Sequence, residues 1–293
     1  MATLVSHGQP GTHPDYKLVK RLEEAIYQQA GGFASFREEI PLLLRKAIDE
    51  VIDAPRTNRF TLEEIEKTEK TYLGTKVEIL LRNHLKLPRG KILDLLIDGI
   101  EVDVKNTMGS SWMIPSEAMG HPCILVITNE KKALFSFGII VIRQPVLTSG
   151  KNKDGKGQIS AAGKEQIHWL LRDEPYPKNF WQDLEPTIRA EITAQSSPNK
   201  RVATLFRLVQ GMPISRVQIL GLAQQEDPMR RLRKNGGARD SLSRQGIAIL
   251  SGQYDRELIE ALNLPTCGRN EFISFTPVNQ EDKEILREKG LVK

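Results

Sequence analysis

Two aspartates and a lysine stand close together in the middle of the chain, and their types and spacing suit the binding of a divalent cation. Asp94 precedes the dipeptide Asp98-Gly99, and Asp103 and Lys105 follow it. Asp-Gly between two β-rich runs is a strong signal for a hairpin with a two-residue loop. With that loop, Asp94 lies directly opposite Asp103. Carboxylate oxygens are the ligands that Mg²⁺ prefers, and Lys105 adds a positive charge on the same side.

The two sides of this predicted hairpin differ in character. Period-two alternation places Asp94, Leu96, Glu101, Asp103 and Lys105 on one side, and Leu93, Leu95, Ile97, Ile100, Val102 and Val104 on the other. Opposed carboxylates roughly 5 Å apart repel by about 3 kcal/mol at an effective dielectric constant of 20. A bound cation offsets this repulsion. The pattern therefore favours a metal site over the alternative, a solvated sheet face with scattered charges.

A helix that carries a third carboxylate, Glu78, is expected before the hairpin. Thr61 with Glu64 three residues later forms a capping-box pattern, which predicts the start of this helix. Apolar residues then recur at steps of three and four, and Pro88–Gly90 ends the pattern. Glu78 thus belongs to the same local unit as the hairpin.

Two strand-like runs, residues 123–128 and 133–142, follow the hairpin, and residues 163–172 predict one more helix. The first part of the chain, residues 1–172, is therefore predicted to be an α/β domain. Residues 173–198 contain several prolines and show no strand character, so they are predicted to link two domains.

The remainder, residues 199–293, predicts a mainly helical domain. Asn199, Ser215 and Asp227 are each placed to cap a helix, and the spacing of these helices is that of a helix-turn-helix. A short apolar strand at residues 247–250 would form part of a β wing. These features predict a winged helix-turn-helix domain.

Positive charge is concentrated in this second domain. Residues 195–250 contain ten Lys or Arg and three Asp or Glu, an excess of +7 that exceeds the +5 of the whole chain. Such an excess suits a phosphate-binding surface, and the alternative is a basic solvated face. The residues expected to contact DNA are Arg230, Arg231, Arg233, Lys234 and Arg239.

Composition excludes several other classes of protein. The 293 residues are 39% hydrophobic and 27% charged, as in ordinary globular proteins, and no apolar run is long enough to span a bilayer. Two cysteines without paired spacing argue against a disulfide framework and a thiolate zinc site. The first residues do not read as a signal peptide, so we expect a cytoplasmic protein.

Longer stretches around these residues resemble the NaeI-type restriction endonucleases, which are type II enzymes of the IIE class. The matching stretches are Tyr72–Ile79, Gly99–Lys105, Trp112–Ala118, Ser160–Gly163, Phe206–Gly211 and Arg233–Arg239. They run from about residue 60 to about residue 252, across both predicted domains.

The resemblance implies a restriction-endonuclease-like domain with a mixed sheet flanked by helices, and a second domain similar to the DNA-binding domain of catabolite activator proteins. It further implies a homodimer in a prokaryotic cell, Mg²⁺, and cleavage of double-stranded DNA that a second DNA copy stimulates. The family's catalytic positions fall on Glu78, Asp94, Asp103 and Lys105. The three carboxylates would serve the metal, Glu78 through water, and Lys105 would orient or help deprotonate the attacking water.

Two other functions remain open at this point. One is a winged-helix transcription regulator whose nuclease-like domain serves dimerisation, although the intact set of acidic and basic residues argues against it. The other is a nicking repair nuclease, which shares the same site chemistry. The sequence does not specify the recognition site, the cut position or a companion methyltransferase.

Overall fold

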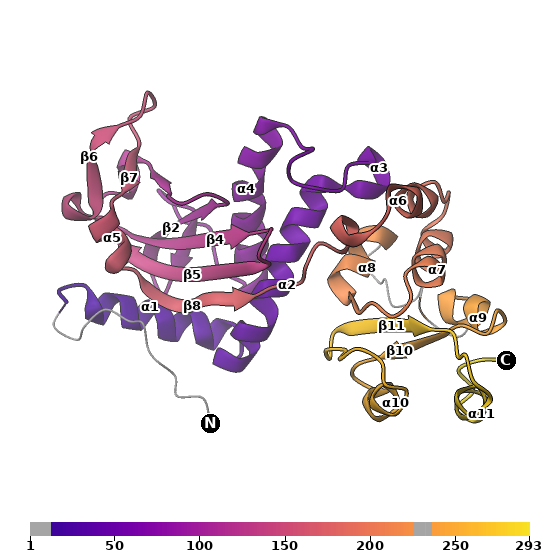
Figure 1. Cartoon of the computed structure of the whole chain (residues 1–293). Helices are drawn as coiled ribbons and strands as arrows, with labels where there is room; N and C mark the ends of the chain where they lie inside the picture. Colours follow the sequence, from indigo (N-terminus) through magenta and orange to yellow (C-terminus); the bar gives the residue numbers. More distant parts are fainter. Residues whose placement is uncertain (1–12, 225–231, 233–235) are drawn as a thin grey trace. The chain divides into compact units, whose positions relative to one another are not determined.

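The computed structural model describes residues 13–224, 232 and 236–293, and the chain divides into two compact units (Figure 1). The first unit contains the chain up to Val51 together with Glu66–Lys178, and the second contains Ile52–Ile65 together with Asn179–Lys293. The chain thus passes between the units three times, at 51/52, 65/66 and 178/179.

A mixed five-stranded sheet forms the centre of the first unit. Its strands, in spatial order, are β1 (Leu95–Ile97), β2 (Ile100–Thr107), β4 (Pro122–Asn129), β5 (Leu134–Val141) and β8 (His168–Pro175). β2 and β4 are parallel, and the other neighbours are antiparallel. The predicted α/β domain with a mixed sheet flanked by helices is confirmed.

Helices α1 (Tyr16–Gln29), α2 (Phe33–Ile52) and α4 (Lys67–His84) flank this sheet. Phe36 of α2 meets the ring of Phe137 on β5 edge-on, with centroids 5.2 Å apart. Arg45 of α2 is fully buried and lies 2.8 Å from the carboxylates of both Asp49 and Glu130. α4 packs against β2, so the helix that carries Glu78 lies beside the strand that carries Asp103 and Lys105.

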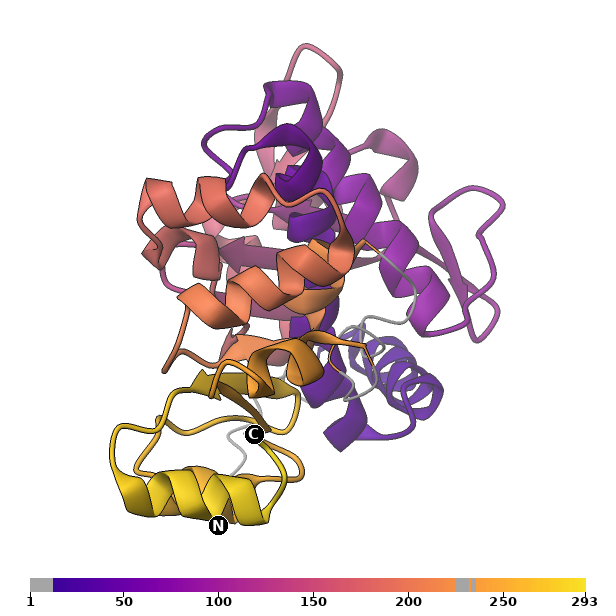
Figure 2. The ribbon, with the colours of Figure 1, turned by 90° about the vertical axis from the view of Figure 1, so that its right-hand side faces the viewer.

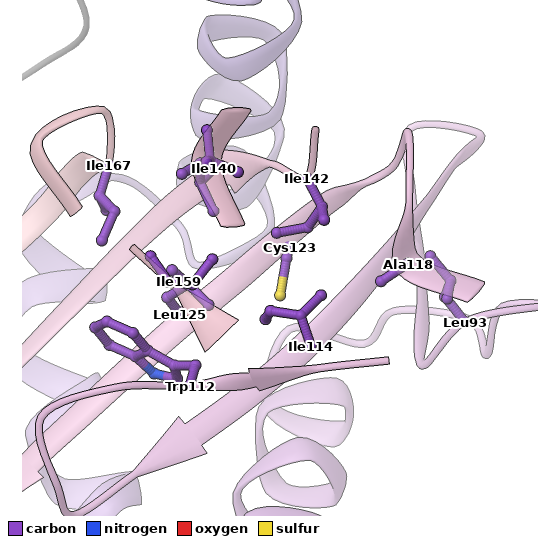
Figure 3. Packing of buried hydrophobic residues seen from close by; sticks show 11 residues of the cluster. Leu93, Trp112, Ile114, Ala118, Cys123, Leu125, Ile140, Ile142, Ile159 and Ile167 are labelled. Atoms are coloured by element: carbon purple, nitrogen blue, oxygen red, sulfur yellow. The ribbon is translucent and has the colours of Figure 1, made fainter. Parts of the chain in front are cut away.

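A small second sheet covers the other face of the main sheet. It contains β3 (Met113–Ile114), β7 (Gly157–Ile159) and β6 (Leu147–Lys151), with the short helices η1 (Ser116–Ala118), η2 (Gln144–Val146) and α5 (Ala161–Glu165) nearby. Figure 3 shows Trp112, Ile114 and Ile159 of this layer packed against Cys123 and Leu125 of β4. The indole N–H of Trp112 donates to the carbonyl of Val126 at 2.8 Å, which ties the layer to the main sheet.

Two predicted helix boundaries are wrong. The helix α4 begins at Lys67 rather than after Thr61, because Glu66 and Glu69 form the capping box that starts it. Glu64 does accept a hydrogen bond from the Thr61 amide at 2.7 Å, but residues 61–65 form only turns and bends. Residues 163–172 are not one helix: they contain the end of α5 and most of β8, because apolar spacing suited to a helix here serves pairing with β5.

The second unit is built on a three-stranded sheet in the order β10-β11-β9. Its elements include α6 (Pro186–Thr193), α7 (Pro198–Leu208), β9 (Ile214–Ser215), α8 (Arg216–Ala223), α9 (Ala238–Ser243), β10 (Ala248–Ser251), α10 (Arg256–Ala261), β11 (Glu271–Phe275) and α11 (Gln280–Glu288). α10 and α11 lie side by side on one face of the sheet, where they close an apolar core with β10 and β11 (Figures 1 and 2).

The helix caps of this unit agree only in part with the prediction, and the expected cap Asp227 lies outside the described residues. Ser215 caps α8, as expected, and it also forms a reciprocal capping box with Gln218. α7 is capped by Ser197 rather than by Asn199, because Pro198 occupies the first helical position and the Ser197 hydroxyl accepts from the Lys200 amide. The expected strand at residues 247–250 is β10, and its partner β11 arrives only after α10 instead of directly across a short wing.

Residues 52–65 precede α4 in the chain yet belong to this second unit. They include the one-turn helix α3 (Ala54–Thr57). The amide of Asn179 donates to the carbonyl of Phe60 at 2.7 Å, and the Phe60 ring lies 5.1 Å from that of Trp181. The 173–198 segment, expected as a linker, contains the end of β8, the short helix η3 (Phe180–Asp183) and α6. Among the described residues, no helix is long and apolar enough to cross a membrane.

Candidate active site

The carboxylate hairpin has the predicted register. Leu96 pairs with Glu101 and Ile97 pairs with Ile100, so Asp98 and Gly99 form the loop. Asp98 has φ 48° and Gly99 has φ 75°, which are the left-handed conformations that a type I′ turn requires at both positions. The Asp-Gly turn thus fixes which residues of β1 and β2 lie opposite each other.

Asp94, Asp103 and Lys105 lie together at the open end of this hairpin. The Lys105 Nζ atom is 2.6 Å from Oδ1 of Asp103 and 3.6 Å from Oδ2 of Asp94. Asp94 also raises the pKa of Asp103, so the two carboxyl groups are electrostatic neighbours. Asp94 Oδ2 also accepts the backbone N–H of Val104 at 2.9 Å. Two carboxylates therefore share one ammonium group in a small volume.

The electrostatics of the cluster show an excess of negative charge. Burial raises the pKa of Asp103 to about 6, with the neighbouring Asp94 adding to the rise and Lys105 opposing it. Burial alone would lower the pKa of Lys105, but the carboxylate of Asp103 outweighs it and the pKa rises above its ordinary value. Lys105 is therefore an ammonium ion at neutral pH, and one such charge does not balance two carboxylates.

Glu78 approaches the cluster from α4. Burial raises its pKa, and the charge of Asp94 adds to the rise, so the two carboxylates are electrostatic neighbours. Its Oε1 atom accepts from Arg82, one helical turn further on, at 3.3 Å. Within the described parts of the chain, no group of three or more His, Cys, Asp or Glu side chains is already arranged to hold a metal ion. The structure thus gathers Asp94, Asp103 and Lys105 closely and leaves Glu78 at the margin.

The side of the hairpin that carries these charges is not open to solvent as a whole. Asp103 is only 2% exposed, because the small second sheet covers the main sheet beside it. The thiol of Cys123, its partner on the parallel strand β4, lies 3.8 Å from Asp103 Oδ2. Leu93 was expected on the apolar side of the hairpin. It packs instead into the hydrophobic core that contains Cys123, because β1 begins only at Leu95. No sequence signal marked Cys123 as a neighbour of the site, since the contact depends on pairing between distant strands.

The donor set fits a divalent cation. All the available ligands are carboxylate oxygens, the hard donors that Mg²⁺ and Ca²⁺ prefer. The raised pKa of Asp103 reflects a buried carboxylate that lacks sufficient positive charge, and a cation would supply it. Glu101, on the same side by alternation, is directed instead to the backbone amides of residues 91–93.

The expected DNA-contacting residues fall mostly outside the described residues: this holds for Arg230, Arg231, Arg233 and Lys234. Arg239 is described, in the first turn of α9, with its side chain 25% exposed and its Nη2 atom 3.8 Å from the Asp255 carboxylate. Burial lowers its pKa. Arg239 is thus a partly buried group near an acidic partner rather than an outward-projecting charge.

Comparison with known proteins identifies the family. The model of the restriction endonuclease NaeI family matches residues 37–284, which include the carboxylate hairpin and most of both units. The type II restriction enzyme NaeI of Lentzea aerocolonigenes is 32% identical to the chain over 257 residues, covering 84% of this chain and 81% of that enzyme. The chain therefore belongs to the NaeI restriction endonuclease family and is a type II site-specific deoxyribonuclease.

Proposed function

We propose that the chain cleaves both strands of DNA with Mg²⁺ at the cluster of Asp94, Asp103 and Lys105. The observation that carries this proposal is a buried carboxylate beside a second carboxylate, with one ammonium group 2.6 Å away. Such a cluster costs free energy in the isolated protein, and a bound cation with a phosphate beside it would relieve that cost.

Each residue has a definable part in this reaction. Asp94 and Asp103 would hold Mg²⁺, and Glu78 would complete its surroundings through water. When bound, the cation supplies positive charge to the phosphate and lowers the pKa of water. Lys105, which is protonated, would orient the attacking water and stabilise the negative charge that develops on the phosphate, rather than accept a proton.

Incubation of the purified protein with plasmid DNA and Mg²⁺, beside a reaction in EDTA, tests this function. Discrete linear fragments that appear only with Mg²⁺ are the expected result. Nicked circles as the final product would indicate a nicking nuclease, and unchanged DNA at all cation concentrations would contradict the proposal.

The second unit, in this proposal, is a winged helix-turn-helix domain that binds a second DNA copy and stimulates cleavage. The order α7, β9, α8, α9, β10, β11, with α10 inserted between the last two strands, and the strand order β10-β11-β9 resemble those of a winged helix, which supports the assignment. The excess of +7 between residues 195 and 250 provides attraction to phosphates.

The double variant Arg230→Ala, Arg233→Ala tests the second DNA site. We expect it to cleave a single-site substrate more slowly, to respond weakly to added cognate oligonucleotide, and to bind DNA with a salt slope reduced by about one unit per lost phosphate contact. Normal cleavage with normal stimulation would show that this region is not the effector site.

Cleavage of both strands is expected to require two active sites, so we also propose a homodimer. Sedimentation of the free protein and of its complex with cognate DNA tests this. Two chains per duplex is the expected stoichiometry, and one chain per duplex that still cuts both strands would contradict it.

A further inference from the structure

The carboxylate of Glu101 is bound by three successive backbone amides. It accepts hydrogen bonds from the N–H groups of Lys91 at 2.8 Å, Ile92 at 3.3 Å and Leu93 at 3.0 Å. Consecutive backbone N–H groups that converge on one anion form a concave binding site for it.

The three amides belong to the segment that leads directly into Asp94. This segment lies between the end of α4 and the first residue of β1, and it has no strand partner of its own. Glu101 therefore replaces the missing strand pairing. From its place on β2, opposite Leu96, it binds the backbone of residues 91–93, just before Asp94. The Leu96 amide, donating to the carbonyl of Pro88 at 2.9 Å, closes the same turn.

Gly90 shows how tightly this turn is closed. A Cβ atom at this position would lie 2.3 Å from Oε2 of Glu101 and 2.4 Å from the carbonyl oxygen of Leu93, distances that real Cβ atoms do not show. Only glycine therefore permits the carboxylate and the backbone to approach in this way.

We infer that Glu101 is a positioning residue for the metal site: its carboxylate holds residues 91–93 so that Asp94 stands beside Asp103. Glu101 itself is not a ligand in this arrangement, because both of its oxygens are engaged by amides. This inference rests on the proposed function, since it assigns Glu101 a task toward the cation that Asp94 and Asp103 would hold.

The conservative variant Glu101→Gln tests the inference with little change in shape. The carboxamide has one acceptor oxygen, and its NH₂ group would face an N–H donor, so at least one of the three hydrogen bonds is lost. Removal of a group that orients a metal ligand typically weakens metal binding by about 10- to 100-fold. We expect the apparent Kd for Ca²⁺ and Mg²⁺ to rise about tenfold in Glu101→Gln and further in Glu101→Ala.

Asp98→Asn is the matched control. It removes one negative charge from the same hairpin, together with the ion pair to Arg21, but leaves residues 91–94 untouched. Cation affinity is measured without DNA, from the rise in melting temperature during Ca²⁺ or Mg²⁺ titration, and again from the Mg²⁺ concentration that half-saturates cleavage. DNA affinity in EDTA provides the separate readout of substrate binding, and we expect it to change by less than about twofold in both variants.

The outcomes separate a positioning role from a merely structural one. If Glu101→Gln lowers the melting temperature but binds cations with wild-type affinity, Glu101 only stabilises the fold and the inference is wrong. Gly90→Ala, which displaces the carboxylate without removing it, is expected to weaken cation binding as well. If only Gly90→Ala does so, Glu101 is not the positioning group. A wild-type protein that neither binds cations nor cleaves DNA would instead overturn the proposed function.

Discussion

Replacement of Asp94 by Asn is expected to stabilise the protein in the absence of metal, although it removes a residue that contacts a lysine. The asparagine keeps the shape of the side chain, and its carbonyl oxygen can still accept the Val104 N–H that Asp94 binds at 2.9 Å. What changes is the charge. The variant loses attraction to Lys105 and loses repulsion from Asp103 and Glu78.

The magnitudes decide the sign of this effect. At an effective dielectric constant of 20, the attraction between Lys105 and Asp94 across 3.6 Å is about 4 to 5 kcal/mol. The repulsion between Asp94 and Asp103, whose oxygens lie 3.6 Å and 2.6 Å from the same Lys105 Nζ atom, is of similar size and largely cancels it. Two favourable effects then remain. The repulsion between residue 94 and Glu78 is lost, and the Asn amide can donate a new hydrogen bond to the Asp103 carboxylate, which contributes about 1.5 to 3 kcal/mol for a charged acceptor. The net gain is about 2 kcal/mol.

Thermal unfolding in EDTA and in Ca²⁺ measures this gain. For a unit of this size, about 2 kcal/mol raises the melting temperature by roughly 4 to 8 °C. The stabilisation that Ca²⁺ gives the wild type is expected to shrink in Asp94→Asn, because a ligand is lost. Asp98→Asn, an exposed aspartate on the same hairpin, is expected to change stability by less than about 1 kcal/mol. A metal-free melting temperature that falls in Asp94→Asn alone would refute the reasoning, since attraction to Lys105 would then outweigh the crowding of carboxylates.

Three further predictions concern the site and the core. Asp103→Ala is expected to abolish cleavage while specific DNA binding in Ca²⁺ or EDTA, measured by gel shift, remains largely intact; cleavage near the wild-type rate would remove Asp103 from the site. Lys105→Ala is expected to abolish cleavage as well, and recovery of the full rate at high Mg²⁺ would assign Lys105 a purely electrostatic part. Burial raises the pKa of Asp49 to about 6 against the opposing effect of Arg45, from 3.8 in the unfolded chain. The folded state thus binds this proton more tightly, and stability falls by up to about 3 kcal/mol as pH rises from about 4 to about 6. Urea titrations of Asp49→Asn across this range are expected to show a flatter profile, and an unchanged slope would mean that Asp49 does not titrate in this way.

The parts of the site that depend on neighbouring residues could be predicted from the sequence. The Asp98-Gly99 turn fixed the hairpin register, because few other residue pairs adopt a positive φ at both positions. Once that register was set, alternation brought Asp94, Asp103 and Lys105 to one side. Outside the site, the cap at Ser215 was equally local, since its hydroxyl accepts from the Val217 amide within the first turn of α8.

The parts that depend on distant segments could not be predicted. Asp103 lies beside Cys123 of β4, which Trp112, Ile114 and Ile159 of the small second sheet's layer cover, and nothing in the hairpin itself encodes that cover. The contact of Glu101 with the amides of residues 91–93 could not be predicted either. A carboxylate on a strand gives the same sequence pattern whether it binds a cation or backbone amides. The start of α4 was misplaced because two capping signals overlap there, and the earlier one lies in a segment that belongs to the other unit.

The segment 52–65 has a consequence for how proteins of this type can diversify. The chain enters the second unit, leaves it to build the nuclease fold from Glu66 onward, and returns at Asn179. A single genetic crossover near residue 178 would therefore separate Phe60 from Asn179 and Trp181, its partners in the same unit. Exchange of the second unit for another would require three matched junctions at once. Because the chain path is interleaved, exchange at a single point would leave the second unit assembled from two different parents.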